Sequence, residues 1–222
     1  MDKCSYFIDN KAMFGGYPEQ KFVESLEKDN VILFVNLTCP SDNLKQYKIS
    51  EKSELINYEI TDRSFPKNNK KFAKFIIKIC NKLKSFKKDE KLYLHCRGGH
   101  GRAGIVVASI LIYMFNLPPE RGLLLTSEYH NNRQNMRKKW RDIGSPQTKT
   151  QKMFVINFFK PLFYFKSNEK HITNGFSTFS KHSVFIEGKG TFQNAEAAFQ
   201  SYKNEDDDVY LKKLLMCDNA YV

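Results

Sequence analysis

Hydrophobic positions change their spacing along this 222-residue chain, and the changes predict alternating strands and helices. Residues 31–37 form a continuous apolar run rich in β-branched side chains, which is typical of a strand covered on both faces. Residues 68–86 instead repeat apolar side chains at helical spacing, with lysines between them. Further strands are predicted at 13–18, 55–60 and 91–95, and further helices at 19–28, 101–116, 120–131, 132–140 and 145–161. Strands that alternate with helices predict an α/β fold, with a central, mainly parallel sheet flanked by helices on both faces.

A glycine-rich stretch joins the predicted strand at 91–95 to the predicted helix at 101–116. Its glycines let the backbone curl until successive N–H groups face one point, beside the partial positive charge of a helix N-terminus. Such a cup binds an anion of the size of phosphate. The residues expected to line the cup are Arg97, Gly98, Gly99, His100, Gly101 and Arg102.

Cys96 and Arg102 stand six positions apart at the two ends of this cup. A cysteine held against N–H groups, a helix N-terminus and a guanidinium is expected to have a pKa well below its free value of about 8.5. Cys96 is therefore expected to be a thiolate, which is the nucleophilic form. The planar fork of Arg102 can hold two phosphoryl oxygens at once and follow them as charge develops.

Two other interpretations of the same stretch stay open. A dinucleotide-binding loop has the glycine spacing G-x-G-x-x-G, which begins at Gly99. That fold requires an acidic residue after a second strand about 20 residues further on, whereas Glu120 and Glu128 lie in helical sequence. A buried structural cysteine beside a tight turn is the second interpretation, and it leaves Arg102 without a role.

The spacing Cys-x5-Arg from Cys96 to Arg102, between a strand and a helix, resembles the signature of the cysteine-dependent protein tyrosine and dual-specificity phosphatases. The resemblance covers about residues 10–165, and the short loops point to the dual-specificity group rather than to the larger tyrosine-specific domain. It implies that Cys96 attacks phosphorus to form a cysteinyl-phosphate, which water then hydrolyses.

The resemblance also indicates a general acid, because a phosphate ester's leaving group needs a proton. In this family the donor is an aspartate that follows the strand preceding the signature, often with a proline close behind. Residues 58–66, Tyr-Glu-Ile-Thr-Asp-Arg-Ser-Phe-Pro, have that order, so Asp62 is the expected acid, with turn capping as the alternative role. Asp42 and Glu59 are competing candidates, although Glu59 alternates with apolar neighbours and is expected to face solvent.

Three further residues are expected to support the cup. His95 precedes the cysteine and is expected to hydrogen-bond the loop from outside, which would help to fix the nucleophile. The stretch 145–148, Ser-Pro-Gln-Thr, is expected to start the last helix with Ser145 as its N-cap. By the resemblance, Gln147 or Gln151 orients the hydrolytic water; the alternative is that both only cap and pack this helix.

One position departs from the family pattern. Ala103 follows the arginine, where the family usually has Ser or Thr, whose hydroxyl supports the thiolate as it leaves the phospho-intermediate. We therefore expect a slower second step and accumulation of phospho-enzyme. A pseudophosphatase that binds phosphorylated ligands without turning them over is the alternative from another functional class.

The formal charge of +12 is uneven, because residues 166–222 hold seven lysines against eight acids. The first 165 residues therefore carry +13, which suits an anionic substrate: a phosphorylated protein, an anionic phospholipid or an RNA 5′ end. Arg97 and His100 are expected to add basic character to the cup. Much of the excess can equally belong to solvated helix faces, and neither a metal site nor a cofactor is indicated.

Cysteine usage and hydropathy predict the compartment. Five cysteines without regular spacing argue against a disulfide framework and for a reducing, cytoplasmic location. No apolar stretch reaches the roughly 18 to 20 residues that span a bilayer, and the N-terminal residues lack the apolar core of a signal peptide.

Residues 166–222 form a second segment, which is similar to the opening of the NADAR (YbiA-like) family. That family is associated with cleavage of N-glycosidic bonds, and Glu196 matches the position of its catalytic glutamate. The segment has 57 residues, whereas such a domain needs well over roughly 100 to enclose its core. We therefore expect a truncated remnant or an appendage behind a catalytic domain of residues 1–165.

Overall fold

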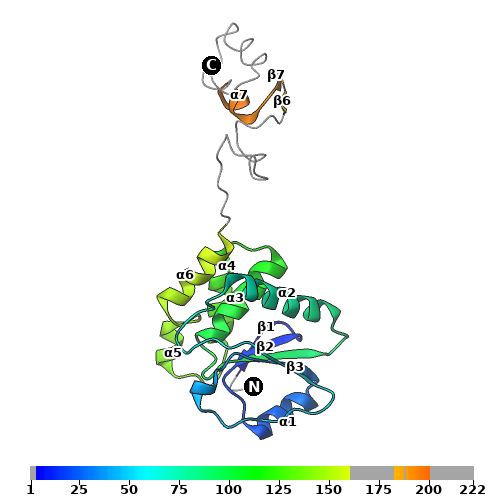
Figure 1. Ribbon diagram of the computed structural model, residues 1–222, viewed down its shortest axis with the longest axis vertical. Coiled ribbons are helices and arrows are strands. Elements are labelled where there is room, and N and C mark those ends of the chain that lie inside the picture. The colour runs from blue at the N-terminus through cyan, green and yellow to red at the C-terminus, as the bar shows by residue number, and fades with distance from the viewer. Residues whose placement is uncertain (1–3, 161–182, 188, 201–222) are drawn as a thin grey trace. The chain divides into compact units, whose positions relative to one another are not determined.

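The computed structural model describes residues 4–160, 183–187 and 189–200 (Figure 1). The chain divides into two compact units, Met1–Lys160 and Pro161–Val222. The domain boundary expected after residue 165 lies outside the described residues.

The first unit is built on a five-stranded sheet with the strand order β1-β2-β5-β3-β4. The strands are β1 (Cys4–Ile8), β2 (Ala12–Gly15), β3 (Val31–Asn36), β4 (Glu54–Asn57) and β5 (Lys91–His95). Within this sheet β1 and β2 are antiparallel and the other three pairs are parallel, so the expected mainly parallel sheet is confirmed. The hydrophobic pattern missed β1, a short edge strand that pairs with β2 across a tight turn in which Asn10 has a φ of 54°.

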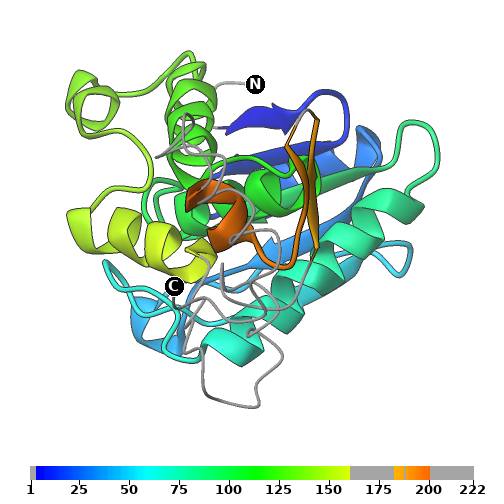
Figure 2. The same ribbon diagram turned by 90° about the horizontal axis from the view of Figure 1, so that it is seen from above.

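Helices cover both faces of this sheet (Figures 1 and 2). They are α1 (Gln20–Lys28), α2 (Asn69–Ser85), α3 (Arg102–Phe115), α4 (Pro119–Asn131), α5 (Lys138–Ile143) and α6 (Lys149–Phe159). On one face, Val23 and Leu26 of α1 pack against Met13, Phe34 and Tyr93 of the sheet. On the other face, α3 contacts α2, α4 and α6. The predicted α/β class is therefore confirmed.

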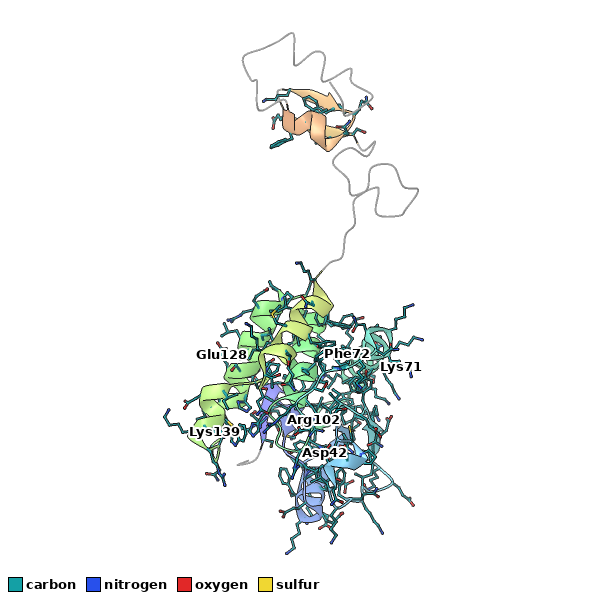
Figure 3. The ribbon with its side chains drawn as sticks, turned by 60° about the vertical axis from the view of Figure 1, so that its left-hand side comes forward. Asp42, Lys71, Phe72, Arg102, Glu128 and Lys139 are labelled. Carbon is teal, nitrogen blue, oxygen red and sulfur yellow. The ribbon has the colours of Figure 1, made fainter. Side chains whose placement is uncertain are left out.

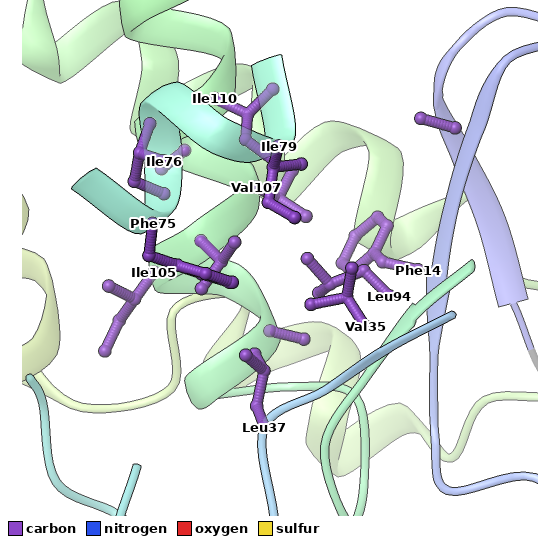
Figure 4. Packing of buried hydrophobic residues seen from close by; sticks show 14 of the residues in the cluster. Phe14, Val35, Leu37, Phe75, Ile76, Ile79, Leu94, Ile105, Val107 and Ile110 are labelled. Atoms are coloured by element: carbon purple, nitrogen blue, oxygen red, sulfur yellow. The ribbon is translucent and has the colours of Figure 1, made fainter. Parts of the chain in front are cut away.

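The main core is centred on α3. Ile105, Val107 and Ile110 of this helix lie in one cluster with Val35 and Leu94 of the sheet (Figure 4). All residues of α3 from 102 to 112 are buried, as expected for a helix that is apolar on every side. This packing holds the first turn of α3 at the carboxyl end of β5, the edge where α/β folds usually bind ligands.

The last helix of this unit begins later than the sequence predicted. Its N-cap is Thr148, whose hydroxyl accepts a hydrogen bond from the N–H of Gln151 at 3.2 Å. In return, the side-chain oxygen of Gln151 accepts one from the N–H of Thr148 at 3.1 Å. This capping box satisfies two helix-end donors, so the helix starts three residues after Ser145, the expected N-cap. The hydroxyl of Ser145 donates instead to the carbonyl oxygen of His100 at 2.6 Å.

The helix predicted at 132–140 is also shorter, because α5 starts only at Lys138. Arg133 lies buried in the interrupted stretch, and its Nη2 donates to the carbonyl oxygens of Phe14 and Gly99 at 3.2 and 3.0 Å. The guanidinium of Arg141 donates to the backbone carbonyl oxygens of Asn131, Arg133 and Gln134, which a continuous helix would use as its own acceptors.

The described part of the second unit is a hairpin followed by one helix. It comprises β6 (Val184–Ile186), antiparallel β7 (Gly190–Phe192) and α7 (Ala195–Gln200). Phe192 packs against Ala197 and Ala198. The side chain of Glu196 and residues 166–182 and 201–222 lie outside the described part, so the NADAR-like assignment stays a prediction.

Candidate active site

The stretch from residue 96 to residue 101, the cup loop, connects β5 to α3 under tight steric limits. Gly99 has a φ of +73°, and a Cβ there would lie 2.3 Å from the carbonyl carbon of Gly15. A Cβ on Gly101 would lie 2.8 Å from Oε1 of Gln151. Gly99 therefore requires glycine, because the backbone at the end of β2 approaches it so closely, whereas a Cβ at Gly101 would displace the side-chain amide of Gln151.

Cys96, the predicted nucleophile, lies at the base of the cup loop and is 3% exposed. Its Sγ accepts a hydrogen bond from the N–H of Gly99 at 3.3 Å, so the sulfur contacts the backbone of the loop, while the residue also belongs to the main hydrophobic cluster. This contact is the kind that the sequence analysis expected. The nucleophilic role of Cys96 stays a prediction.

Arg102 is the first residue of α3, and its guanidinium is hydrogen-bonded to the carboxylate of Asp42. Figure 3 labels both residues in the same part of the first unit. Nη1 lies 2.7 Å from Oδ2 of Asp42, and Nη2 lies 2.9 Å from Oδ1, so the pair is bidentate. Nη1 also donates to the carbonyl oxygen of Ile60 at 3.1 Å. The two side chains are 2% and 3% exposed, which makes this a buried ion pair.

Both members of this pair are charged. Burial on its own would lower the pKa of Arg102, but the hydrogen bonds to Asp42 and the neighbouring Cys96 and Asp62 raise it above its ordinary value. Conversely, the hydrogen bonds from Arg102 hold the pKa of Asp42 below its usual range. Asp42 was a competing candidate for the general acid, yet the structure makes it an ionised partner of Arg102. An ionised, fully engaged carboxylate has no proton to donate.

Asp62, the predicted general acid, lies in the turn that follows β4. Its Oδ1 is 3.0 Å from Nη2 of Arg102, and its side chain is 56% exposed. The structure therefore brings Asp62 to the open side of the guanidinium. Glu59, the other candidate, is also exposed, and it lines a separate polar pocket together with Tyr17 and Asn57.

His95 is fully buried, and its contacts differ from the predicted ones. Nε2 hydrogen-bonds the hydroxyl of Tyr47 at 2.7 Å, whereas Nδ1 has no hydrogen-bond partner among the described residues. The expected hydrogen bond from this ring to the cup loop is therefore replaced by one to Tyr47. Burial lowers the pKa of His95 to about 3, so the ring is neutral at pH 7.

His100 does not add the positive charge that the sequence analysis expected. Its Nδ1 hydrogen-bonds Nε2 of His130 at 2.7 Å, and its ring stacks on Trp140 with centroids 4.6 Å apart. Burial, followed by the charge of Arg133, lowers the pKa of His100 to about 4 and that of His130 to about 3. His95, His100 and His130 are together called the neutral histidines.

Gln151 is fully buried and both ends of its amide are hydrogen-bonded within the protein. Oε1 accepts from the N–H of Thr148, and Nε2 donates to the carbonyl oxygen of Ser64 at 2.9 Å. Gln151 thus connects α6 with the turn that carries Asp62, two residues before Ser64. Gln147 is half-buried, and orientation of water by either glutamine stays a prediction.

Sequence reasoning missed two charged residues that shape the site. Asp42 was considered only as an acid, although the 3-10 turn Pro40–Asp42, capped by Cys39, marks it as a fixed position. Arg133 was not singled out, because a lone arginine after a helix carries no motif. Its guanidinium binds the carbonyl of Gly99 and lies 4.4 Å from the centre of the Phe14 ring, so it holds the outer side of the cup loop.

The described residues were compared with the features of membrane-spanning helices and of metal sites. Among residues 4–160, 183–187 and 189–200, no helix is both long and apolar enough to cross a bilayer. Within the same ranges, no group of three or more His, Cys, Asp or Glu side chains is arranged to hold a metal ion.

Curated relatives come from two viruses. The chain is 37% identical over 161 residues to "Putative tyrosine phosphatase 067L" of Invertebrate iridescent virus 3, which covers 72% of this chain and 66% of that protein. It is 36% identical over 195 residues to "Putative tyrosine phosphatase 197R" of Invertebrate iridescent virus 6, covering 82% of this chain and 65% of the relative. This chain therefore spans just under two thirds of the length of these relatives.

Solved structures share the fold. Tk-PTP in its active form superposes with a TM-score of 0.55 at 20% identity, over 70% of this chain and 94% of that one. Kinase associated phosphatase superposes with a TM-score of 0.53 at 17% identity, over 70% and 92% of the two chains.

A family described as "Polymorphic toxin system, DSP-PTPase phosphatase" matches residues 13–116, from β2 through α3. This range contains Cys96, Arg102, Asp42 and Asp62. The chain belongs to the cysteine-dependent dual-specificity and tyrosine protein phosphatase family.

Proposed function

We propose that this chain hydrolyses phosphomonoesters through a cysteinyl-phosphate intermediate. The observation that supports this proposal is the meeting of three groups at the carboxyl end of β5. The sulfur of Cys96 faces the cup loop, and Arg102, which carries the guanidinium, is the first residue of the helix that follows this loop. The carboxylate of Asp62 contacts the same guanidinium at 3.0 Å.

In the first step the thiolate of Cys96 attacks phosphorus, an S–P bond forms, and the bond between phosphorus and the ester oxygen breaks. Asp62 gives its proton to the departing oxygen, so the leaving group departs as a neutral alcohol. Asp42 occupies one edge of the Arg102 guanidinium, so phosphoryl oxygens bind at Nε and at the side of Nη2, where they displace Asp62 from its 3.0 Å contact and free its carboxyl group to face the leaving oxygen.

In the second step water attacks phosphorus, the S–P bond breaks and the Cys96 thiolate is released. The carboxylate of Asp62, now deprotonated, takes a proton from that water. Ala103 is buried and supplies no hydroxyl to the leaving thiolate, so we expect this step to be the slower one.

Phosphotyrosine, phosphoserine or phosphothreonine in a protein is the first candidate substrate, because the viral relatives are named tyrosine phosphatases. An anionic phospholipid and an RNA 5′ phosphate are the alternatives, supported by the basic character of the catalytic unit.

The experiment compares the full chain with Cys96→Ser and Asp62→Asn on para-nitrophenyl phosphate and on an alkyl phosphate. Cys96→Ser is expected to abolish turnover. Asp62→Asn is expected to lower turnover on the alkyl phosphate, a poor leaving group, by about 100-fold or more and to remove the basic limb of its pH profile. Wild-type turnover by Cys96→Ser would disprove the mechanism, and wild-type turnover of the alkyl phosphate by Asp62→Asn would disprove the role of the acid. Tight binding of phosphate esters by wild type without any turnover would identify a pseudophosphatase.

A further inference from the structure

A second pocket lies directly beside the cup loop and takes no part in the chemistry described above. It has a volume of about 270 Å³. Its described lining includes Arg97, Gly98, His100, Arg133, Arg137 and Trp140. The pocket and the cup share Arg97, Gly98 and His100, so a group bound in one is adjacent to a group bound in the other.

The charge of this pocket has one sign. Arg97, Arg133 and Arg137 line it, and none of its described lining residues is acidic. Since His100 is held neutral by burial, which lowers its pKa to about 4, the positive charge comes from the arginines. An anion in the pocket would therefore meet guanidinium groups and no carboxylate.

The three arginines differ in burial and in hydrogen bonding within the protein. Arg133 is 3% exposed and fixed by its bonds to Phe14 and Gly99. Arg97 and Arg137 are exposed, and their side chains form no hydrogen bond or ion pair with the other described residues. Guanidinium groups without a protein partner keep their forks available for phosphate oxygens.

We propose that this pocket binds a second phosphate group of the substrate, next to the phosphate that the cup hydrolyses. Two anions bound in sites that share the loop residues Arg97, Gly98 and His100 are most readily supplied by a compact scaffold, with the phosphates on neighbouring carbons or in one polyphosphate chain. An inositol bisphosphate head group and a nucleoside 5′-polyphosphate are the two sources of this chemistry. A singly phosphorylated protein side chain leaves Arg137 without an anion. This inference rests on the proposed hydrolase function and narrows its substrate class.

The test measures kcat/KM of the full chain on three matched pairs. These are an inositol monophosphate and bisphosphate, a nucleoside 5′-monophosphate and 5′-triphosphate, and a singly and a doubly phosphorylated peptide. For at least one compact pair, the polyphosphorylated member is expected to be favoured about tenfold or more through a lower KM, the effect of one charge-assisted contact.

The variant is Arg137→Gln, and the matched control is Arg121→Gln, an exposed arginine of α4 that does not line the pocket. In Arg137→Gln the preference ratio is expected to fall about tenfold, whereas Arg121→Gln is expected to keep the wild-type ratio. The inference is overturned if wild type shows no preference, or if Arg137→Gln retains it. It is also overturned if only the peptide pair shows a preference, which would assign the pocket to proteins.

Failure of the proposed hydrolysis gives a different result. If wild type hydrolyses neither these compounds nor para-nitrophenyl phosphate, the proposed function is wrong. Calorimetry of inorganic pyrophosphate binding to wild type and to Arg137→Gln then tests the pocket without depending on hydrolysis. About tenfold weaker binding by the variant supports the second phosphate site, and equal binding overturns it.

Discussion

Replacement of Asp42 by Asn tests whether the buried ion pair holds Arg102 in place. The substitution keeps the shape of the side chain but removes its charge. The amide oxygen of the new Asn can still accept a hydrogen bond from the guanidinium. The amide nitrogen would replace Oδ1, which lies 2.9 Å from Nη2 of Arg102, so two hydrogen-bond donors would face each other there. Arg102 is 2% exposed, so its charge cannot be solvated by water instead.

The expected loss of stability follows from this geometry. Breaking a buried ion pair by changing one partner costs about 3–5 kcal/mol. The lower end, about 3 kcal/mol, is expected because Arg102 keeps its contacts with the Ile60 carbonyl and with Asp62. For a unit of this size, that loss lowers the unfolding temperature by about 6–12 °C.

The assay is urea unfolding followed by the fluorescence of Trp140, the sole tryptophan of the chain, which stacks on His100. Asp9→Asn, at an exposed turn position, is the matched control and should stay within about 0.5 kcal/mol of wild type. Turnover should also fall at least tenfold in Asp42→Asn, because a guanidinium that can rotate no longer presents its free edge to the phosphate. Equal unfolding midpoints for the Asp42 and Asp9 variants would refute the reasoning.

The stabilisation of the folded state by the ion pair between Asp42 and Arg102 depends on pH. Ion pairing holds the pKa of Asp42 below its usual range, so its stabilisation is complete above the unfolded pKa of about 4. The stabilisation is then lost as the pH falls through the lower, folded pKa. The free energies of unfolding of Asp42→Asn and wild type should therefore come closer together as the pH is lowered.

Three further predictions concern other parts of the site. Rapid mixing should show a burst of product in wild type that Ala103→Ser abolishes by speeding hydrolysis of the phospho-enzyme; absence of a wild-type burst would contradict this. Stability should fall from pH 6.5 toward pH 4, because burial keeps the neutral histidines unprotonated in the folded state while the unfolded chain binds up to three protons; urea midpoints that do not change between pH 7 and pH 5 would rule this out. Gln151→Ala should cost about 1–3 kcal/mol and reduce turnover, since the carbonyl of Ser64 loses its donor and the turn carrying Asp62 loosens; Gln147→Ala is the comparison, and equal effects of the two would argue against this connection.

Local pattern was a reliable guide wherever one segment decides its own structure. The helical spacing of apolar residues at 68–86 became α2, and the β-branched run at 31–37 became β3. Both patterns reflect side-chain periodicity, which is encoded in neighbouring residues. The start of α5 was displaced where Arg133 finds a partner more than 30 residues away, which no local window contains. The start of α6 was instead set by the capping box of Thr148 and Gln151, a local pattern that competes with the expected N-cap at Ser145.

The spacing of Cys96 and Arg102 was visible in the sequence by itself, because a single loop between a strand and a helix holds both residues. The sequence also placed Asp62 in a turn after a strand, and it indicated an α/β phosphatase fold. Only the tertiary structure decided that Asp42 forms an ion pair with Arg102, which is 60 positions away in the sequence. It also decided that burial keeps His100 neutral and that Arg97 and Arg137 line one pocket. Ion pairing, desolvation and shared cavities depend on which distant residues meet, and that is settled when the sheet and its helices pack together.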